Sequence, residues 1–144
     1  MPHKRWKLKY QTSYEASVAC LGGEFTKKIL IVDNSKYMTN ILSYRLEYIG
    51  YAVETAKDGE EALDKIVTFD PNLILLDLMI PKISGTEVLR TIKENGLLNK
   101  LSVITMSSNS LEHYKLLSLK LGAEFFIKKP FDLDDIESRI KKML

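Results

Sequence analysis

Four apolar runs in this 144-residue sequence are each followed closely by a polar residue that can do chemistry. The residues that follow them are Asp33 and Asn34, Asp77, Ser107 and Lys129. Carboxylate and amide oxygens, with no His or Cys among them, suit a hard cation such as Mg²⁺. The sequence leaves two uses open for Asp77: a ligand for Mg²⁺ in phosphate ester hydrolysis, or a nucleophile that accepts a phosphoryl group while the cation, serine and lysine hold its oxygens.

Asp77 ends the most apolar of these runs, Leu73–Leu76. Pro81 and Gly85 then interrupt the chain before the next helical pattern. A short continuous apolar run is typical of a strand that is buried on both faces. An isolated Asp at such a place is ordinarily a loop or helix-capping residue, so the remaining elements must decide whether Asp77 belongs to a site.

The elements that position these residues alternate regularly from Lys27 onward. Apolar runs predict strands at 29–32, 51–55, 73–76, 101–106 and 124–127. Helical periodicity with Ser35 and Asp132 as N-caps predicts helices at 35–49, 60–69, 86–94, 111–121 and 132–144. The helix at 60–69 is expected to turn Ala62, Leu63, Ile66 and Val67 inward.

Five strand–helix units predict an α/β fold with a doubly wound parallel sheet, right-handed crossovers and helices on both faces. The carboxyl ends of parallel strands lie at one edge of the sheet, which is where ligands bind in such folds. The polar residues that follow the strands are therefore expected to meet at that edge.

Composition excludes several other functions. Of 21 basic and 19 acidic side chains, four basic and two acidic ones lie in residues 1–26, which leaves 17 of each in 27–144. That balance argues against a nucleic-acid-binding surface in the main domain. No apolar run approaches the 18 residues of a membrane span, and the single Cys20 allows no internal disulfide. His3 and His113 are expected to be surface residues.

Residues 1–26 are interpreted as an N-terminal leader, partly ordered at best, with derivation from an expression vector as one explanation, ahead of one domain at 27–144. The leader lacks the apolar stretch of a signal peptide. We expect a cytoplasmic protein.

Residues 28–144 resemble the receiver domains of two-component response regulators, of the single-domain kind found among chemotaxis regulators. The resemblance rests on four motifs in order: ILIVDNS, LILLDLMIPKISG, VITMSS and FFIKKPFD. Asp33 and Asp77 are 44 positions apart, Ser107 follows 30 positions later and Lys129 a further 22, as in that family. The resemblance implies a flavodoxin-like sheet with strand order 2-1-3-4-5.

The resemblance also implies roles for individual residues. Asp77 would be phosphorylated by a sensor histidine kinase or a phosphotransfer protein. Lys129 would pair with the phosphoryl group, and Ser107 and Phe126 would form the switch. Asp33, Asn34, Asp77 and the backbone carbonyl of Met79 would hold Mg²⁺. The peptide bond between Lys129 and Pro130 matches one that is cis in the family, although an X–Pro bond is usually trans.

One position departs from the family pattern. Receiver domains usually carry two acidic residues after the first strand, and here the second is Asn34. A neutral amide oxygen leaves the site with one negative charge fewer, which predicts weaker Mg²⁺ binding.

Three other hypotheses remain open from the sequence. The chain can be a phosphorylation-independent pseudo-receiver, a Mg²⁺-dependent phosphatase, or the receiver part of a longer regulator. Asp77-Leu78-Met79 lacks the second Asp of the DxD motif in phosphatases that resemble haloacid dehalogenases. The favoured hypothesis is a monomeric or weakly dimeric module that catalyses only its own phosphorylation and dephosphorylation. It would bind a kinase and an unidentified downstream protein, and contact neither nucleic acid nor membrane directly.

Overall fold

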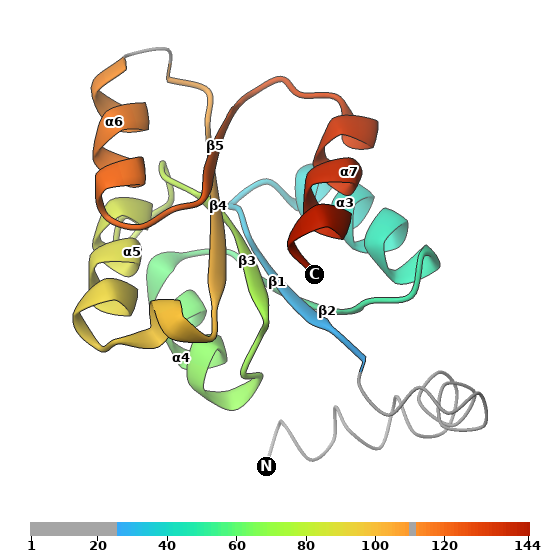
Figure 1. Cartoon of the computed structure of the whole chain (residues 1–144). Coiled ribbons are helices and arrows are strands. Elements are labelled where there is room, and N and C mark those ends of the chain that lie inside the picture. The colour runs from blue at the N-terminus through green and yellow to red at the C-terminus, as the bar shows by residue number, and fades with distance from the viewer. Residues whose placement is uncertain (1–25, 110–111) are drawn as a thin grey trace.

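The computed structural model describes residues 26–109 and 112–144. Its core is a five-stranded parallel sheet in the order β2-β1-β3-β4-β5, which is the predicted order (Figure 1). The strands are β1 (Lys28–Val32), β2 (Ala52–Ala56), β3 (Leu73–Asp77), β4 (Ser102–Ser107) and β5 (Phe125–Lys128). β1 and β3 in the middle of the sheet are almost completely buried, which is why their sequences are continuously apolar.

One helix follows each strand. Within the described residues, the helices that follow the strands are α3 (Lys36–Tyr48), α4 (Gly59–Thr68), α5 (Gly85–Glu94), α6 (Glu112–Lys120) and α7 (Leu133–Met143), and a short 3₁₀ helix, η1 (Leu97–Asn99), precedes β4. The predicted N-caps are confirmed, because Ser35 accepts a hydrogen bond from the N–H of Met38 and Asp132 accepts one from Asp134.

The helices cover both faces of the sheet. α4 and α5 pack on one face around a core cluster that includes Leu30, Ile74 and Val103. α3 and α7 pack on the other face around a cluster that includes Ile31 and Ile104. Figure 1 shows α3 and α7 side by side on one side of the sheet and α4, α5 and α6 on the other. The predicted doubly wound α/β fold is therefore confirmed.

Several local predictions are wrong in detail. Val67 was expected to point inward, but its side chain is 79% exposed because it follows Ile66 on the outer flank of α4. The short 3₁₀ helix η1, which follows Gly96, was not among the predicted elements. Strands β2, β4 and β5 each lie one residue later than their predicted ranges, as happens when side-chain patterns are used to place hydrogen-bonded ladders.

The predicted leader falls almost entirely outside the described residues, so its order stays a prediction. Among residues 26–109 and 112–144, no helix is long and apolar enough to cross a membrane.

Candidate functional site

The side chains of Asp33, Asp77 and Lys129 meet at the carboxyl edge of the sheet, as the sequence predicts. The Lys129 ammonium nitrogen Nζ lies 2.5 Å from Oδ2 of Asp33 and 3.0 Å from Oδ2 of Asp77. Both carboxylates are almost fully buried, with side chains that are 2% and 10% exposed. Buried carboxylates that face each other require a cation, and Lys129 supplies it in this structure.

Backbone hydrogen bonds fix each carboxylate in place. Oδ1 of Asp33 accepts the N–H of Ser35 at 2.8 Å, and Oδ1 of Asp77 accepts the N–H of Met79 at 2.9 Å. These are the turns that a short acidic side chain forms with the residue two positions later. Each carboxylate therefore has one oxygen held by its own loop and the other turned toward Lys129.

The strand register brings these loops together. Val32 of β1 pairs with Leu76 of β3, so the next residues, Asp33 and Asp77, leave the sheet at the same level. Lys129 follows β5, and its N–H donates to the carbonyl of Ser107 at 2.9 Å. Its long side chain then reaches from the far edge of the sheet to the carboxylates.

The loop after Asp77 needs the glycine that the sequence places there. A Cβ atom on Gly85 would lie 2.3 Å from the carbonyl oxygen of Asp77, closer than any side chain can be. The N–H of Gly85 also donates to the carbonyl of Leu78 at 3.1 Å. The start of α5 is therefore packed directly against the backbone of the Asp77 loop.

Burial and charge act in opposite directions on Lys129. Burial by itself lowers the pKa of the ammonium group, but the hydrogen bonds and charges of Asp33 and Asp77 together outweigh it. The pKa of Lys129 is therefore raised above its usual value of 10.5. The ammonium group stays protonated at neutral pH, and the site holds two negative charges and one positive charge.

Ser107 ends β4, the strand next to β3 and Asp77, and Phe126 lies on β5, one strand further out. Ser107 is completely buried at the end of β4, and its Oγ accepts a hydrogen bond from the N–H of Asn109 at 3.0 Å. Phe126 is half-buried on β5, opposite Thr105 of β4. The peptide bond between Lys129 and Pro130 is cis, as in the family that the sequence resembles.

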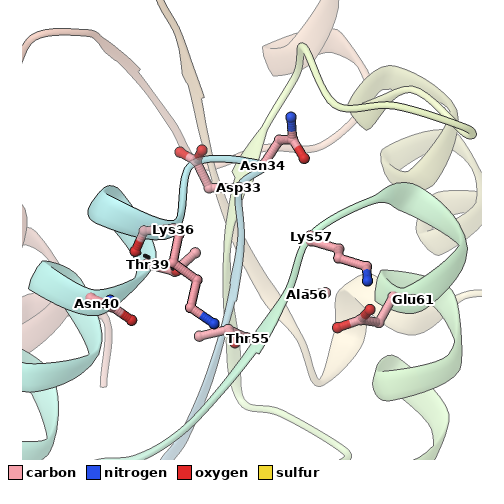
Figure 2. Close-up of a pocket in the computed structure, with 9 residues that line it drawn as sticks. All are labelled: Asp33, Asn34, Lys36, Thr39, Asn40, Thr55, Ala56, Lys57 and Glu61. Carbon is pink, nitrogen blue, oxygen red and sulfur yellow. Dashed lines mark hydrogen bonds between the residues drawn. The ribbon is translucent and has the colours of Figure 1, made fainter.

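Only two of the four expected metal ligands face each other in the structure. Asp33 and Asp77 face each other, whereas the Asn34 side chain is exposed, and Figure 2 shows it directed away from that of Asp33. Met79 is 51% exposed and contributes its N–H to Asp77 in this structure. Among the residues described, no three His, Cys, Asp or Glu side chains come together as a metal site.

This donor set nevertheless fits Mg²⁺. Mg²⁺ in proteins is commonly held by one or two carboxylates together with water and phosphate oxygens, so a third carboxylate is not required. Each carboxylate oxygen of Asp33 and Asp77 accepts one of the hydrogen bonds described above and retains a second lone pair. Asp33 and Asp77 can therefore bind a cation without a change in the backbone around them.

A polar pocket beside the acidic pair was not predicted from the sequence. It has a volume of about 280 Å³ and lies between the first turns of α3 and α4 (Figure 2). Its lining includes Lys36, Asn40, Thr55, Lys57 and Glu61. None of these five residues was among the predicted site residues. They come together because of how α3 and α4 pack against the sheet.

The buried Thr105 was also missed. It is 0% exposed and lies within the strand predicted at 101–106 from its apolar residues. A hydroxyl in the middle of a buried strand must find a partner within the protein, so this residue was a signal that could have been followed.

Comparison with known proteins agrees with this geometry. Residues 29–141 match the response regulator receiver domain family. The alkaline phosphatase synthesis transcriptional regulatory protein PhoP of Bacillus subtilis is 41% identical over 118 residues, which cover 82% of this chain and 48% of that protein. The chain thus spans about half the length of the curated relatives it matches.

Solved structures show the same similarity. A CheY-like receiver domain from Methanospirillum hungatei is 31% identical with a TM-score of 0.77, over 82% of this chain and 93% of that one. The Thermotoga maritima regulator TrrA, solved in complex with Mg²⁺ and beryllium fluoride, is 33% identical with a TM-score of 0.73, over 83% and 100%. With the predicted strand order and the acidic site at the carboxyl edge, these matches show that the chain belongs to the response regulator receiver domain family.

Proposed function

We propose that Asp77 accepts a phosphoryl group from a histidine kinase or a phosphotransfer protein in a Mg²⁺-dependent step. The phosphorylated form then alters a surface that binds a downstream protein. The observation that carries this proposal is the contact of one largely buried ammonium group, that of Lys129, with the two buried carboxylates of Asp33 and Asp77. A carboxylate at the end of a buried strand, beside a fixed cation, is well placed to act as a nucleophile.

The transfer step needs no other protein nucleophile. An Asp77 carboxylate oxygen forms a bond to phosphorus, while the bond between phosphorus and the donor's histidine nitrogen breaks. The bonding electrons leave with the imidazole, and the product is an acyl phosphate on Asp77. Lys129 can form an ion pair with the transferred phosphoryl group, because its ammonium already lies 3.0 Å from Oδ2 of Asp77. The chain would catalyse only this step and the later hydrolysis.

Asp33 and Asp77 would hold the Mg²⁺ ion, together with the carbonyl of Met79 and with Asn34 if its side chain rotates. When bound, the ion neutralises charge on the phosphoryl oxygens during transfer. The TrrA complex with Mg²⁺ and beryllium fluoride supports this part of the proposal by similarity. Asp33 is kept oriented for this role by Ser35.

Incubation with acetyl phosphate and Mg²⁺, followed by intact mass measurement, tests the proposal. We expect the mass of one added phosphoryl group, and no increase when the metal is removed by a chelator. A protein that gains no mass in the presence of acetyl phosphate and Mg²⁺ would favour the pseudo-receiver alternative. Release of inorganic phosphate from unrelated phosphate esters would favour the phosphatase alternative.

Asn34→Asp should tighten Mg²⁺ binding. In water, a unit charge about 4 Å from a divalent ion is worth about 2 kcal/mol, and screening by salt reduces this, so we expect a roughly tenfold lower dissociation constant. Phosphorylation at subsaturating Mg²⁺ should be faster for the same reason. A Mg²⁺ titration followed by NMR measures both variants, with Asn40→Asp, a second Asn of the same pocket, as the control.

Equal Mg²⁺ affinity of the Asn34→Asp variant and the wild type would mean that residue 34 points away from the ion, as its exposed side chain does in this structure. A comparable gain in the Asn40→Asp variant would show a general effect of added charge instead of a ligand at position 34.

Ser107→Ala should uncouple phosphorylation from α6. The proposed switch requires the Ser107 hydroxyl to leave Asn109 and move toward a phosphoryl oxygen, with Phe126 filling the space. Such a movement shifts an equilibrium that exists before phosphorylation. NMR of α6 should show phosphorylation-dependent shifts in the wild type that are absent in this variant. Ser108→Ala, which changes the exposed neighbour, should retain them.

The output of the domain is proposed to be a protein contact in the cytoplasm, made by a monomer or weak dimer. The name of the Bacillus subtilis relative describes a transcriptional regulator, which supports a role in gene regulation. The equal numbers of acidic and basic residues in 27–144 support an indirect role, through another protein or domain, because a DNA-binding surface is usually basic.

A further inference from the structure

Little apolar surface anchors α6 to the sheet. Within Glu112–Lys120 the one buried residue is Ser118, while Leu116 and Leu119 are 58% and 37% exposed. Leu117 packs against the core only partly buried. The neighbouring helix α5 buries three apolar side chains completely: Val88, Leu89 and Ile92. Because stabilisation scales with buried apolar area, α6 is held less firmly by packing than α5 is.

The buried residue of α6 is attached to β4 by a hydrogen bond between two hydroxyl groups. Oγ1 of Thr105 lies 3.0 Å from Oγ of Ser118, and both residues are buried. The Ser118 hydroxyl donates its own proton to the carbonyl of Lys115, 3.0 Å away. Its oxygen is then free to accept the proton of Thr105. A polar contact thus takes the place that an apolar stripe occupies on α5.

This hydrogen bond can break without leaving a buried polar group unpaired. The Thr105 hydroxyl has one proton and two acceptors, Ser118 Oγ at 3.0 Å and the carbonyl of Phe125 at 3.3 Å. If α6 moves away, Thr105 can donate to Phe125 instead, and Ser118 keeps its bond to Lys115. Since orphaned buried groups are the costly part of a lost hydrogen bond, separation at this contact costs only the net contribution of the bond itself.

Thr105 is also a neighbour of both residues of the proposed switch. Side chains alternate along a strand, so Thr105 and Ser107, two positions apart on β4, lie on the same face of the sheet. Val103 on that face belongs to the cluster that also contains Leu117. Thr105 pairs with Phe126 across β4 and β5. Thr105 therefore lies between the Ser107 end of β4 and α6, so a displacement of that strand end would move Thr105 first.

We propose that Thr105 and Ser118 are positioning residues whose hydrogen bond holds α6 against the sheet and couples it to the end of β4. In the unphosphorylated protein the bond keeps α6 in place. When Ser107 and Phe126 move, Thr105 exchanges Ser118 for the Phe125 carbonyl, and α6 is released. The coupling to phosphorylation rests on the function proposed above, whereas the bond itself does not.

A double-mutant cycle on the full chain tests the link. Thr105→Val removes the hydroxyl with little change in shape, and Ser118→Ala removes its partner. Amide hydrogen exchange of α6 is measured in both variants, in the double variant and in the wild type. The cycle also cancels the higher helix propensity of Ala. We expect a coupling of roughly 2- to 10-fold in exchange protection, the range that corresponds to one net hydrogen bond.

Two further variants act as controls. Thr105→Ser keeps the hydroxyl and should retain the coupling to Ser118, which a role in packing alone would not predict. Thr91→Val removes a hydroxyl that donates to Glu87 within α5, and it should leave exchange in α6 unchanged. The link would be overturned if the two changes act independently. The loss of exchange protection in the Thr105→Val and Ser118→Ala double variant would then equal the product of the losses in the two single variants.

The switching role has its own measurement. Without phosphorylation, Thr105→Val should already displace the NMR resonances of α6 toward their positions in the phosphorylated wild type. Resonances identical to those of the unphosphorylated wild type would overturn the coupling. Intact mass after acetyl phosphate treatment reports separately on Asp77. The exchange cycle uses unphosphorylated protein, so its result stands even if Asp77 accepts no phosphoryl group.

Discussion

Replacing Asp77 by Asn is expected to abolish the gain of a phosphoryl group completely. The amide has nearly the shape of the carboxylate, and its oxygen can still accept the N–H of Met79. The charged nucleophile is lost, however, and the neutral amide oxygen is too weak a nucleophile to form the acyl phosphate. Intact mass after incubation with acetyl phosphate and Mg²⁺ should match that of untreated protein.

Asp132→Asn is the matched control for this experiment. Asp132 is an exposed carboxylate that caps α7, and Asn caps helices equally well. This variant should take up the phosphoryl group like the wild type. A full mass gain in Asp77→Asn would move the acceptor to another side chain, with Asp33 the first candidate because it shares the Lys129 ammonium group.

Replacing Lys129 by Met is expected to destabilise the metal-free protein by about 3 kcal/mol at pH 7, the lower end of the range for removing one partner of a buried ion pair. The family resemblance implies only that Lys129 pairs with the phosphoryl group. The structure adds a second role, because its side chain is only 16% exposed and contacts both buried carboxylates. Methionine retains the length and apolar stem of the side chain, so the loss of free energy reports the missing charge.

Three measurements isolate that charge. Lys128→Met alters the exposed neighbouring lysine and should change the unfolding free energy little. Addition of Mg²⁺ should stabilise Lys129→Met more than it stabilises the wild type, because the ion replaces the missing cation. Lys129→Met combined with Asp77→Asn should be less destabilised than the sum of the single effects, since only one buried carboxylate then remains. Urea unfolding at pH 7 measures each variant.

The pH dependence has a definite sign. The pKa of Lys129 is raised in the folded protein, so the stabilisation that results is fully present below the usual value of 10.5. It is lost as the pH rises through the folded value. Between pH 6 and 9 the destabilisation of Lys129→Met relative to the wild type should therefore not decline through deprotonation of this lysine. A loss of the difference within that range would mean that Lys129 is neutral in the folded protein.

The destabilised Lys129→Met variant should still accept some phosphoryl group when Mg²⁺ is present, because Asp77 and its backbone hydrogen bond remain. The NMR resonances of α6 in this variant should not shift on phosphorylation as they do in the wild type, since no ammonium group is present to contact the phosphoryl group on Asp77. Complete absence of phosphorylation in a folded, Mg²⁺-bound variant would show that Lys129 is needed for the transfer itself.

The sequence by itself determined the architecture of this protein. The interior strands β1 and β3 read as continuous apolar runs because they are buried on both faces, and the helices are marked by caps such as Ser35 and Asp132. Alternation of the two elements then leaves a parallel sheet as the one arrangement with short connections of the right hand. The same logic placed Asp33, Asp77 and Lys129 at one edge, since each follows a strand.

Only the tertiary structure decided which side chains touch. Lys129 and Asp33 are 96 positions apart in sequence, and their contact depends on the register of β1, β3 and β5. The outward direction of Asn34 is likewise set by its loop and cannot be read from residue type. Thr105 in a buried strand signals that its hydroxyl needs a partner, but only the packing of α6 on the sheet shows that the partner is Ser118. Periodicity reports which face of an element is buried, but polar partners are chosen by packing in three dimensions.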